Sequence, residues 1–484
     1  MTTVEKPESE LLSLEDAAEF LCVSKSTVYR LLEQRKLTGM KAGKLWRFRK
    51  EDLLAYMQRG PAALALAKVP EHLLDAELAF FATALQQAGA TIEDDAPPAD
   101  DEAGKLARLV RQMVQLLIAV KGSDLHLDPV REPDGDCLLL KLRVEGSLRE
   151  IRRLPAALHD ALVLEWKRLA GLSIEERLRP QEGSARLAAR QMLRVAVVPV
   201  QYGEKVTART IPTQVPTLAA LGIAQTPLNE WLQRPHGLIL ILGPTGSGKM
   251  TTEAACVQEI MTTHAWNIMT VEDPVEYLFP AGVTQLKLEQ FTCADGLRAV
   301  MSHDPDVIVV GELSADRELV QLTVVAAETG HLVLTCMHAN DAISPLFDFL
   351  DLGIKRSLLA NNLIGICLQR LAPKLCAACR VPVEPEPALL DRIRRSAEEG
   401  GYCLPDDAVF YHATGCPECR GRIALHEFIT FTPAIRSAFL RCATSEEFTR
   451  AVREQGQLSF FAEQAKNAVA GRISLDTLLR FMPF

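Results

Sequence analysis

The sequence has no uninterrupted apolar run of the about 18 residues that a membrane-spanning helix needs. Its first ten residues, MTTVEKPESE, have no basic stretch followed by an apolar one, which is the pattern of a secretory signal. The sequence therefore predicts a soluble protein that is not exported and that can still dock on a membrane protein.

An excess of positive charge is also missing, because 62 Asp and Glu outnumber 53 Lys and Arg and give a net charge of -9. This balance excludes a protein that coats nucleic acid with its whole surface, but it permits a local basic patch. Global disorder is excluded as well, since 48% hydrophobic and 24% charged residues are ordinary globular usage. The length of 484 residues predicts roughly three or four domains.

Residues 1–60 predict a small domain of two helices, a short hairpin and a closing helix, from the spacing of their apolar residues. Ser13 opens the run Ser-Leu-Glu-Asp, which predicts a capping box with Asp16 at the third helical position. The second helix, expected over Lys25–Glu33, would occupy the position of a recognition helix. This pattern resembles the excisionase-type winged helix-turn-helix family.

That resemblance implies DNA binding, and the local charge agrees with it. Over residues 11–59, ten Lys or Arg against six Asp or Glu leave a net charge of +4, which suits phosphate neutralisation. A protein-docking module is the alternative, because such folds are reused without DNA. The candidate DNA-binding residues on the second helix and the wing are Lys25, Ser26, Thr27, Arg30, Lys44, Arg47 and Arg49.

The next 150 residues predict a connecting segment and then an α+β domain. Residues 61–104 combine an alanine- and leucine-rich helical stretch with the acidic, proline-containing linker TIEDDAPPADDEAG. Residues 105–215 begin with a predicted helix and continue with strand-like runs at Ser123–Pro129 and Leu140–Ile151. We expect the α+β domain to precede the segment that carries the chemistry.

The strongest motif is GLILILGPTGSGKMTT, in which a buried strand, Leu238–Leu242, leads into a glycine-rich loop and then a helix. Glycines let successive N–H groups converge on phosphate oxygens, and Lys249 adds a charge for the β and γ phosphates. A chance glycine turn is the alternative. The predicted nucleotide-binding residues are Gly243, Pro244, Thr245, Gly246, Ser247, Gly248, Lys249 and Thr251.

The residue after the lysine departs from the usual P-loop, which offers a hydroxyl to Mg²⁺ at this position. Here it is Met250, a soft thioether, whereas magnesium prefers hard oxygen ligands. Thr251 is about 100° further around the helix, so it cannot take over without a local shift. Water could fill the gap.

Two acidic clusters follow predicted strands, where α/β sheets build their sites. The strand at Asn267–Val271 ends in EDPVEY, and the strand at Val307–Val310 ends in Gly-Glu. A carboxylate there can orient the attacking water or hold magnesium through water, so Glu276 and Glu312 are candidate catalytic residues. A solvated acidic loop is the alternative.

Two histidines, His331 and His338, border a third predicted strand, Leu332–Cys336. A lone histidine is usually structural. Because these two occupy strand ends that we expect beside the P-loop, they are candidates for sensing phosphate.

The motifs GPTGSGK, VEDPVEY, DPDVIVVGE and TGHLVLTCMHAND, in this order, closely resemble those of the type II secretion and type IV pilus assembly ATPases, over about residues 105–484. The resemblance implies a multidomain α/β protein with a RecA-like core in residues 216–484 that ends in C-terminal helices. It implies an Asp box with Glu272 and Glu276, a Walker B glutamate at Glu312 and a His box with both histidines.

The resemblance also extends to cofactors and partners. It implies that Arg194 and Arg209 of the α+β domain reach the nucleotide, where a planar guanidinium suits the γ phosphate. ATP and Mg²⁺ are then the expected ligands, and a homo-hexamer is the expected assembly. The expected partners are inner-membrane platform, secretion or pilus assembly proteins, which would place the chain in the cytoplasm, peripheral to the inner membrane.

Two Cys-X-X-Cys pairs, separated by 36 residues, predict a metal site if the thiols are reduced. Four thiolates, from Cys376, Cys379, Cys416 and Cys419, make a closed tetrahedral Zn²⁺ site, which is structural because no coordination position is left open. Unpaired thiols are the alternative. The resemblance implies such a zinc subdomain, residues 371–425, in the assembly ATPases but not in the retraction motors.

Three departures from the family fall around one nucleotide: Met250, Ser302-His303 in place of Arg-Gln, and Ser314-Ala315 in place of Arg-Asp. A lost preorganised contact costs about 10²- to 10³-fold in turnover, and a lost transition-state arginine about 10³-fold or more. The predicted function is an ATP-binding and ATP-hydrolysing motor, slowed by these departures. The alternative is a degenerate ATP-binding regulator that binds DNA through its N-terminal domain.

Overall fold

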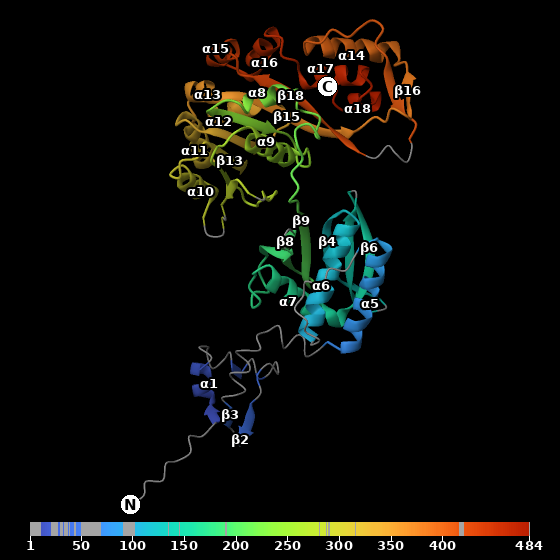
Figure 1. Ribbon diagram of the computed structural model, residues 1–484, viewed down its shortest axis with the longest axis vertical. Helices are drawn as coiled ribbons and strands as arrows, with labels where there is room; N and C mark the ends of the chain where they lie inside the picture. Colours follow the sequence, from blue (N-terminus) through green and yellow to red (C-terminus); the bar gives the residue numbers. More distant parts are fainter. Residues whose placement is uncertain are drawn as a thin grey trace, which may run out of the picture. The chain divides into compact units, whose positions relative to one another are not determined.

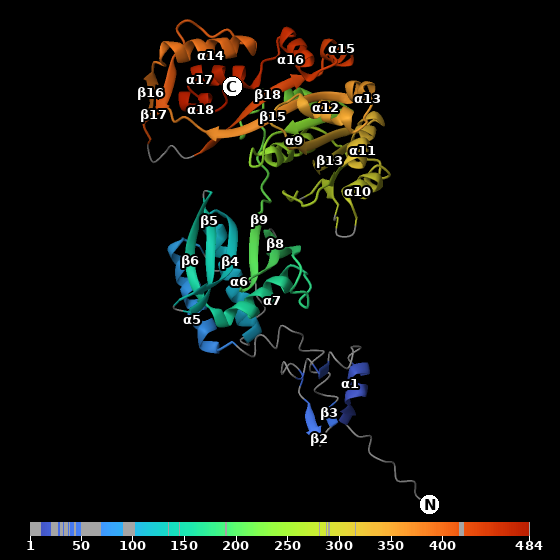
Figure 2. The same ribbon diagram turned by 180° about the vertical axis from the view of Figure 1, so that it is seen from behind.

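The computed structural model divides the chain into two compact units, Met1–Ile211 and Pro212–Phe484 (Figures 1 and 2). The division falls close to the predicted boundary after residue 215. The structure describes residues 11–20, 28–29, 32, 37, 39–42, 45–49, 69–90, 102–133, 135–144, 146–188, 191–279, 281–286, 288, 291–314, 316–415 and 421–483.

The N-terminal part of the first unit contains a small sheet and a helix. Strand β3 (Leu45–Arg49) pairs antiparallel with both β1 (Leu11–Ser13) and β2 (Met40–Ala42), and α1 (Leu14–Phe20) follows β1. The predicted capping box is confirmed at the start of α1. The N–H of Asp16 donates to Ser13 Oγ at 3.2 Å, and the N–H of Ser13 donates to Asp16 Oδ2 at 3.0 Å.

Of the predicted recognition helix, the structure describes Val28, Tyr29 and Leu32, which are helical. Val28 is fully buried and packs with Phe48 of β3, whereas Tyr29 is exposed. The helical period therefore places these residues as the sequence predicted, with Val28 facing inward.

The rest of the first unit is an α+β domain. Within the described residues, six antiparallel strands lie in the order β6-β5-β4-β9-β8-β7. Burial alternates along β9, as expected for a sheet with one face against a core. The elements are α5 (Glu71–Gln87), α6 (Glu102–Ala119), β4 (Gly122–Glu132), β5 (Gly135–Val144), β6 (Ser147–Pro155), the 3-10 turn η1 (Ala156–Leu158), α7 (His159–Leu169), β7 (Gln181–Ala188), β8 (Gln191–Val200) and β9 (Gly203–Ile211).

Helix α5 belongs to the core of this domain. Its buried residues Leu74, Phe81 and Leu85 lie in the same hydrophobic cluster as α6 and the sheet, and α5 and α6 lie side by side in Figure 1. In the sequence, this helix falls within the predicted connecting segment 61–104, because apolar spacing does not indicate which surface a helix covers.

The second unit is built on a mainly parallel sheet. Among the residues described, its seven strands lie in the order β12-β11-β13-β14-β10-β15-β18, and β18 is antiparallel to its neighbour β15. The strands are β10 (Gly237–Leu242), β11 (Ile268–Val271), β12 (Val283–Gln285), β13 (Val307–Glu312), β14 (Leu332–Met337), β15 (Leu363–Pro373) and β18 (Arg422–Thr430).

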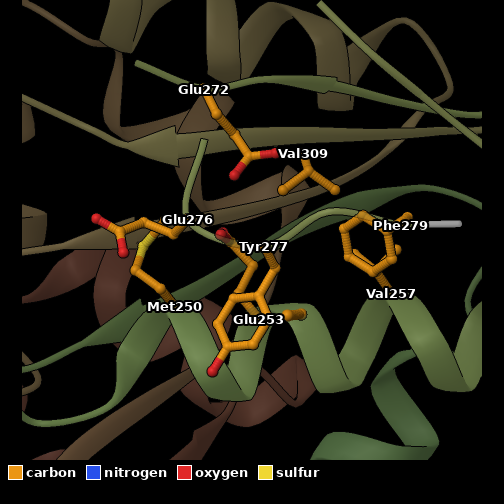
Figure 3. A pocket seen from close by; sticks show the side chains of 9 residues that line it. Met250, Glu253, Val257, Glu272, Glu276, Tyr277, Phe279 and Val309 are labelled. Atoms are coloured by element: carbon orange, nitrogen blue, oxygen red, sulfur yellow. The ribbon is translucent and has the colours of Figure 1, made fainter. Parts of the chain in front are cut away.

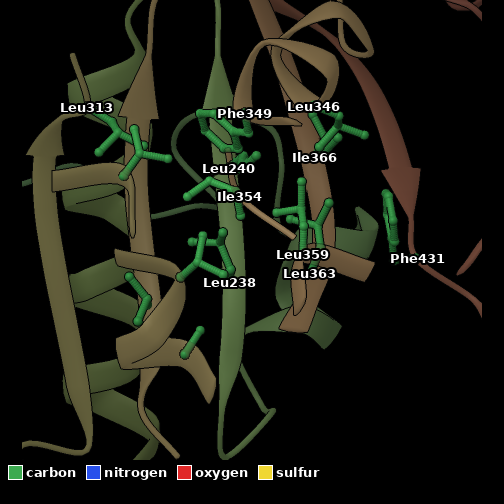
Figure 4. Packing of buried hydrophobic residues seen from close by; sticks show 14 of the residues in the cluster. Leu238, Leu240, Leu313, Leu346, Phe349, Ile354, Leu359, Leu363, Ile366 and Phe431 are labelled. Carbon is green, nitrogen blue, oxygen red and sulfur yellow. The ribbon is translucent and has the colours of Figure 1, made fainter. Parts of the chain in front are cut away.

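Strand β10 is buried on both faces, which explains its continuous apolar run. Leu238, Leu240 and Leu242 pack into one cluster, part of which Figure 4 shows, and Ile239 and Ile241 pack into a second. The helices associated with the sheet are α8 (Pro227–Trp231), α9 (Lys249–Thr263), α10 (Cys293–Val300), α11 (Arg317–Glu328), α12 (Ser344–Asp351) and α13 (Arg356–Asn362).

The C-terminal part of the second unit has its own core. The short strands β16 (Arg380–Val383) and β17 (Phe410–Ala413) pair antiparallel, and α14 (Pro387–Glu399) connects them. Ile393, Phe410 and Phe461 are buried together in this core. The remaining helices are α15 (Pro433–Arg441), α16 (Ser445–Glu454), α17 (Phe460–Val469) and α18 (Leu475–Leu479).

In the part of the chain that the structure describes, none of the helices combines the length and the apolar character needed to cross a bilayer.

Candidate nucleotide site

The glycine-rich loop connects the interior strand β10 to α9, so the predicted order of strand, loop and helix is confirmed. Gly243, Gly246 and Gly248 have φ angles of +155°, +75° and +83°, in the region that favours glycine. A Cβ at Gly243 would clash with the carbonyl oxygen of Gln369 and would lie 2.6 Å from Ser247 Oγ, whereas a Cβ at Gly246 would meet nothing within 4 Å. Two different constraints therefore hold the loop.

The side chain of Lys249 lies on this loop. Its Nζ donates to the carbonyl oxygens of Gly243 and Pro244, at 2.9 and 3.3 Å, and the residue is buried. Nζ is also 3.9 Å from Glu312 Oε1 and 3.4 Å from His338 Nδ1. The positive charge that the sequence predicted for phosphate is thus held at the loop itself.

Glu312 and His338 meet beside this lysine. Glu312 ends β13 and His338 follows β14, and the two strands are parallel neighbours, so their carboxyl ends lie at the same edge of the sheet. His338 Nε2 is 2.7 Å from Glu312 Oε1. The structure therefore brings together three of the predicted site residues.

His331 does not join this group. It precedes β14, and its carbonyl oxygen accepts the N–H of Gly237 at 3.0 Å, at the start of β10. Its ring Nδ1 lies 2.8 Å from the carbonyl oxygen of Ala326. The prediction that both histidines lie beside the phosphate loop is wrong for His331 within one chain, because residues before and after a parallel strand lie at opposite edges of the sheet.

The carboxylates of the predicted Asp box line a pocket next to α9. Glu272 is buried, and it accepts a hydrogen bond from Gln285 Nε2 at 3.3 Å. Burial raises the pKa of the Glu272 carboxyl above its ordinary value. The lining residues, shown in Figure 3, are Met250, Glu253, Ala254, Val257, Glu272, Glu276, Tyr277, Phe279 and Val309.

The hydroxyl of the residue that follows Met250 is already engaged. Thr251 Oγ1 lies 2.9 Å from the hydroxyl of Tyr277. This contact agrees with the expectation that Thr251 cannot simply replace the missing hydroxyl. The other loop side chains differ in exposure: Ser247 is buried, Pro244 is half-buried and Thr245 is exposed.

Two functional candidates were missed in the sequence. Glu253 is a carboxylate on the buried face of α9, four residues after Lys249, and a charge at such a position is the signal that could have revealed it. Gln369 is the second. Its Nε2 donates to the carbonyl oxygen of Ser247 at 2.8 Å, and its Oε1 accepts from Thr252 Oγ1 at 2.7 Å.

The two serine departures both lie at the surface. Ser302 is exposed in the turn after α10, where its N–H donates to the carbonyl oxygen of Ala299 at 3.1 Å. Ser314 is exposed two residues after Glu312.

The two predicted arginines lie opposite each other on β8 and β9 of the first unit. Arg209 Nε donates to Asp124 Oδ1 at 2.7 Å, and Arg194 donates to Glu182. Burial alone would raise the pKa of Asp124, but hydrogen bonds from Arg209 and Ser123 bring it below its ordinary value. Each arginine is therefore paired with a carboxylate of its own unit.

The first cysteine pair follows β15, with Cys376 half-buried and Cys379 buried. Both the N–H and Oγ1 of Thr414 donate to the carbonyl oxygen of Cys379, at 3.1 and 2.9 Å. Thr414 lies two residues before Cys416, but Cys416 and Cys419 are outside the described residues. Among the residues that are described, no three potential ligands gather into a metal cluster.

Most of the DNA-binding candidates cannot be placed. Arg47 and Arg49 lie on β3, where Arg47 is half-buried and donates to the carbonyl oxygen of Trp46 at 3.1 Å, and Arg49 is exposed. The others lie outside the described residues: Lys25, Ser26, Thr27, Arg30 and Lys44.

Comparison with known families finds two matches. Residues 99–480 match the family described as "Type II/IV secretion system protein", and residues 11–61 match a helix-turn-helix domain family. The second match agrees with the predicted N-terminal domain.

Individual relatives agree with the first match. The chain is 33% identical to the type II secretion system protein HxcR of Pseudomonas aeruginosa, over 80% of each chain. It is 34% identical to the type II secretion system protein E of Pectobacterium carotovorum, over 87% of this chain and 84% of that one. It is 32% identical to the type IV pilus assembly ATPase PilB of Thermus thermophilus, over 80% of this chain and 44% of that one.

Solved structures show the same fold. The pilus retraction motor PilT with bound ADP superposes with a TM-score of 0.59 at 25% identity, covering 77% of this chain and 96% of that one. The ATPase DotB of Legionella pneumophila superposes with a TM-score of 0.56 at 21% identity, over 77% of this chain and 94% of its own. The second unit therefore has the RecA-like P-loop fold of secretion ATPases.

Proposed function

We propose a motor function on the premise that this chain belongs to the Type II/IV secretion system protein family, whose model matches residues 99–480. The chain is an ATPase of the secretion and pilus assembly type. We infer that ATP-driven movement of its domains works on a pilin-like or pseudopilin-like machine.

The observation that carries this proposal is the group of Lys249, Glu312 and His338 at the phosphate loop. The loop N–H groups and Lys249 would hold the β and γ phosphates. Glu312 and Glu276 would orient the attacking water. His338, which contacts Glu312, would sense the γ phosphate. Mg²⁺, held by carboxylates of this site, would supply charge neutralisation at the phosphates.

Arg194 and Arg209 are proposed to reach the γ phosphate of a nucleotide. Arg194 is paired with Glu182, and Arg209 is paired with Asp124. A phosphate would therefore have to compete with these ion pairs. Bidentate guanidinium contacts with phosphate belong to the same strong class as those with carboxylate.

We also propose that Cys376, Cys379, Cys416 and Cys419 hold a structural Zn²⁺ ion. The support is the pairing of β16 with β17, which aligns Arg380 with Ala413, and the hydrogen bonds from Thr414 to Cys379. These contacts bring the chain leading to the second cysteine pair beside the first pair, although 36 residues separate the pairs in the sequence. The zinc would stabilise the subdomain of residues 371–425.

The proposed assembly is a homo-hexamer in the cytoplasm, peripheral to the inner membrane, that docks on platform or pilus assembly proteins. The support is the relationship to secretion system E proteins and to a pilus assembly ATPase.

Steady-state ATP hydrolysis by the purified chain, with Lys249→Ala as the blank, tests the motor function. We expect magnesium-dependent turnover above the blank. ATP binding without turnover above the blank would reject the motor and favour a regulator that only binds nucleotide. If calorimetry detects no ATP binding beyond that of Lys249→Ala, both functions fail.

A second candidate function is regulation through DNA, and the helix-turn-helix match over residues 11–61 favours it. The local charge of +4 and the exposed Arg49 are consistent with phosphate contacts. Retention on duplex DNA should then weaken steeply with salt and should disappear when residues 1–60 are removed. Equal retention of the full and shortened chains would reject this function.

A further inference from the structure

We propose that Glu253 and Glu272 form a magnesium site in the pocket beside the phosphate loop, where they replace the hydroxyl that Met250 does not offer. The site rests on the proposed nucleotide binding, because phosphate oxygens would complete the coordination of the cation.

Glu253 is the residue that points to a ligand. It is only 3% exposed. The Cys336 thiol donates to its carboxyl group, but Oε1 has no hydrogen-bond partner among the described residues. A buried carboxylate oxygen without a partner is costly, and a bound cation would remove that cost.

The position of Glu253 on α9 directs its carboxylate toward the loop. It follows Met250 by three residues and Lys249 by four, so all three side chains share one face of the helix. Side chains in a helix point toward its N-terminus, which here is the end that carries the phosphate loop. Glu253 can therefore present an oxygen at the level where residue 250 presents its thioether.

Glu272 supplies the second carboxylate. It follows β11 directly and enters the pocket opposite α9, as Figure 3 shows. Glu253 and Glu272 line the same pocket. Two adjacent carboxylates repel each other unless a proton or a cation lies between them.

The chemistry of this pair suits magnesium. Mg²⁺ is usually held by one or two carboxylates together with phosphate oxygens and water, and it prefers hard oxygen to a thioether. The pair offers that number of carboxylates, at the edge of the sheet where Lys249 and Glu312 also lie.

The test compares ATP affinity in excess magnesium with ATP affinity in excess EDTA, measured by calorimetry on the full-length chain. For the wild type we expect magnesium to strengthen binding. In Glu253→Gln, which keeps the size of the side chain but cannot ligate as an anion, this strengthening should fall by about tenfold or more. Glu259→Gln, on the same helix but outside the pocket, is the matched control and should behave as the wild type.

Two further variants secure the interpretation. Met250→Thr introduced into Glu253→Gln should restore the effect of magnesium, because it returns a hydroxyl ligand. Glu253→Asp, which shortens the side chain, should give an intermediate effect and serves if Glu253→Gln does not fold. Electron paramagnetic resonance of Mn²⁺ with ADP should show manganese immobilised by the wild type and released by Glu253→Gln.

An undiminished effect of magnesium in folded Glu253→Gln and Glu253→Asp would overturn the proposal, as would ATP binding by the wild type that magnesium does not strengthen. Absence of ATP binding even in EDTA would instead defeat the proposed function itself, so the two failures are distinguishable.

Discussion

Gln369 links the phosphate loop to the strands behind it through its side-chain amide. The amide contacts the Ser247 carbonyl oxygen, Thr252 Oγ1 and His426 Nε2, at 2.8, 2.7 and 3.0 Å. Because an amide oxygen can only accept, His426 must carry a hydrogen on Nε2, as a neutral imidazole with this tautomer does. The conformation of the loop is thus coupled to a histidine on β18.

His426 predicts how stability changes with pH. Burial lowers the pKa of its imidazole to about 4 from the ordinary 6.5. Between these values the unfolded chain binds a proton that the folded chain does not, so this contribution is fully present above pH 6.5 and is lost as the pH falls toward 4. We expect the free energy of unfolding to fall by about 1–2 kcal/mol between pH 7 and pH 5 through this residue.

Urea unfolding of the wild type and of His426→Gln at both pH values measures this contribution. Glutamine can still donate to Gln369 but does not titrate, so the variant should lose less stability on acidification. His236→Gln, at an exposed position, is the control. Equal losses in the wild type and His426→Gln would contradict the assignment.

At the scale of elements, the loop between β10 and α9 requires glycine for two different reasons. Gly246 needs glycine for its backbone angle, since space is open around a Cβ there. Position 243 needs glycine for two reasons. Its φ angle favours glycine, and the backbone of β15 passes close to it at Gln369.

Alanine substitutions at these two glycines should therefore differ in effect. Gly246→Ala should cost about 1 kcal/mol and weaken ATP binding by less than about tenfold. Gly243→Ala should weaken it by about 100-fold or more, because a backbone carbonyl cannot move aside as a side chain can. Calorimetry with ATP, with Lys249→Ala as the blank, gives both values. Similar affinities in the two alanine variants would show that the approach of β15 does not matter.

The antiparallel pair of β16 and β17 leads to a prediction about metal binding. If the four cysteines bind Zn²⁺, elemental analysis should find about one zinc per chain, and Cys379→Ser should lose it. The zinc-free protein should melt roughly 5 °C lower or more. Cys403→Ser, at an exposed cysteine in the same subdomain, is the matched control and should keep its metal. Full zinc content in Cys379→Ser would rule out this ligand set.

At the scale of the whole molecule, the residues proposed to contact one nucleotide are divided between two units. Lys249 and Glu312 belong to Pro212–Phe484, whereas Arg194 and Arg209 belong to Met1–Ile211. If the arginines that reach a nucleotide come from a neighbouring chain of the proposed homo-hexamer, activity should depend on assembly.

Turnover per chain should therefore rise with protein concentration, in parallel with the oligomer mass from light scattering. Arg194→Ala and Arg209→Ala should each lower turnover, by up to about 10³-fold if that arginine stabilises the transition state. Arg149→Ala, an exposed arginine of the same domain, should leave turnover unchanged. Constant turnover per chain across the concentration range would argue against a shared site.

Sequence reasoning was accurate where neighbouring residues determine the structure. The capping box of Ser13 and Asp16 and the succession of β10, loop and α9 each depend on a few consecutive residues. The predicted position of His331 beside the phosphate loop was wrong. The motif indicates that two histidines border a strand, but it does not indicate that only one end of that strand adjoins the loop. Glu253 was overlooked because its meaning depends on which face of α9 is buried.

The sequence by itself determined the class of the protein, since its ordered motifs encode a phosphate loop, acidic strand ends and paired cysteines through local chemistry. Only the tertiary structure decided which of those groups meet. Parallel pairing places Glu312 and His338 together, and the approach of β15 places Gln369 on the loop. Such contacts join residues far apart in the chain, so they depend on sheet order and packing, which local spacing does not specify.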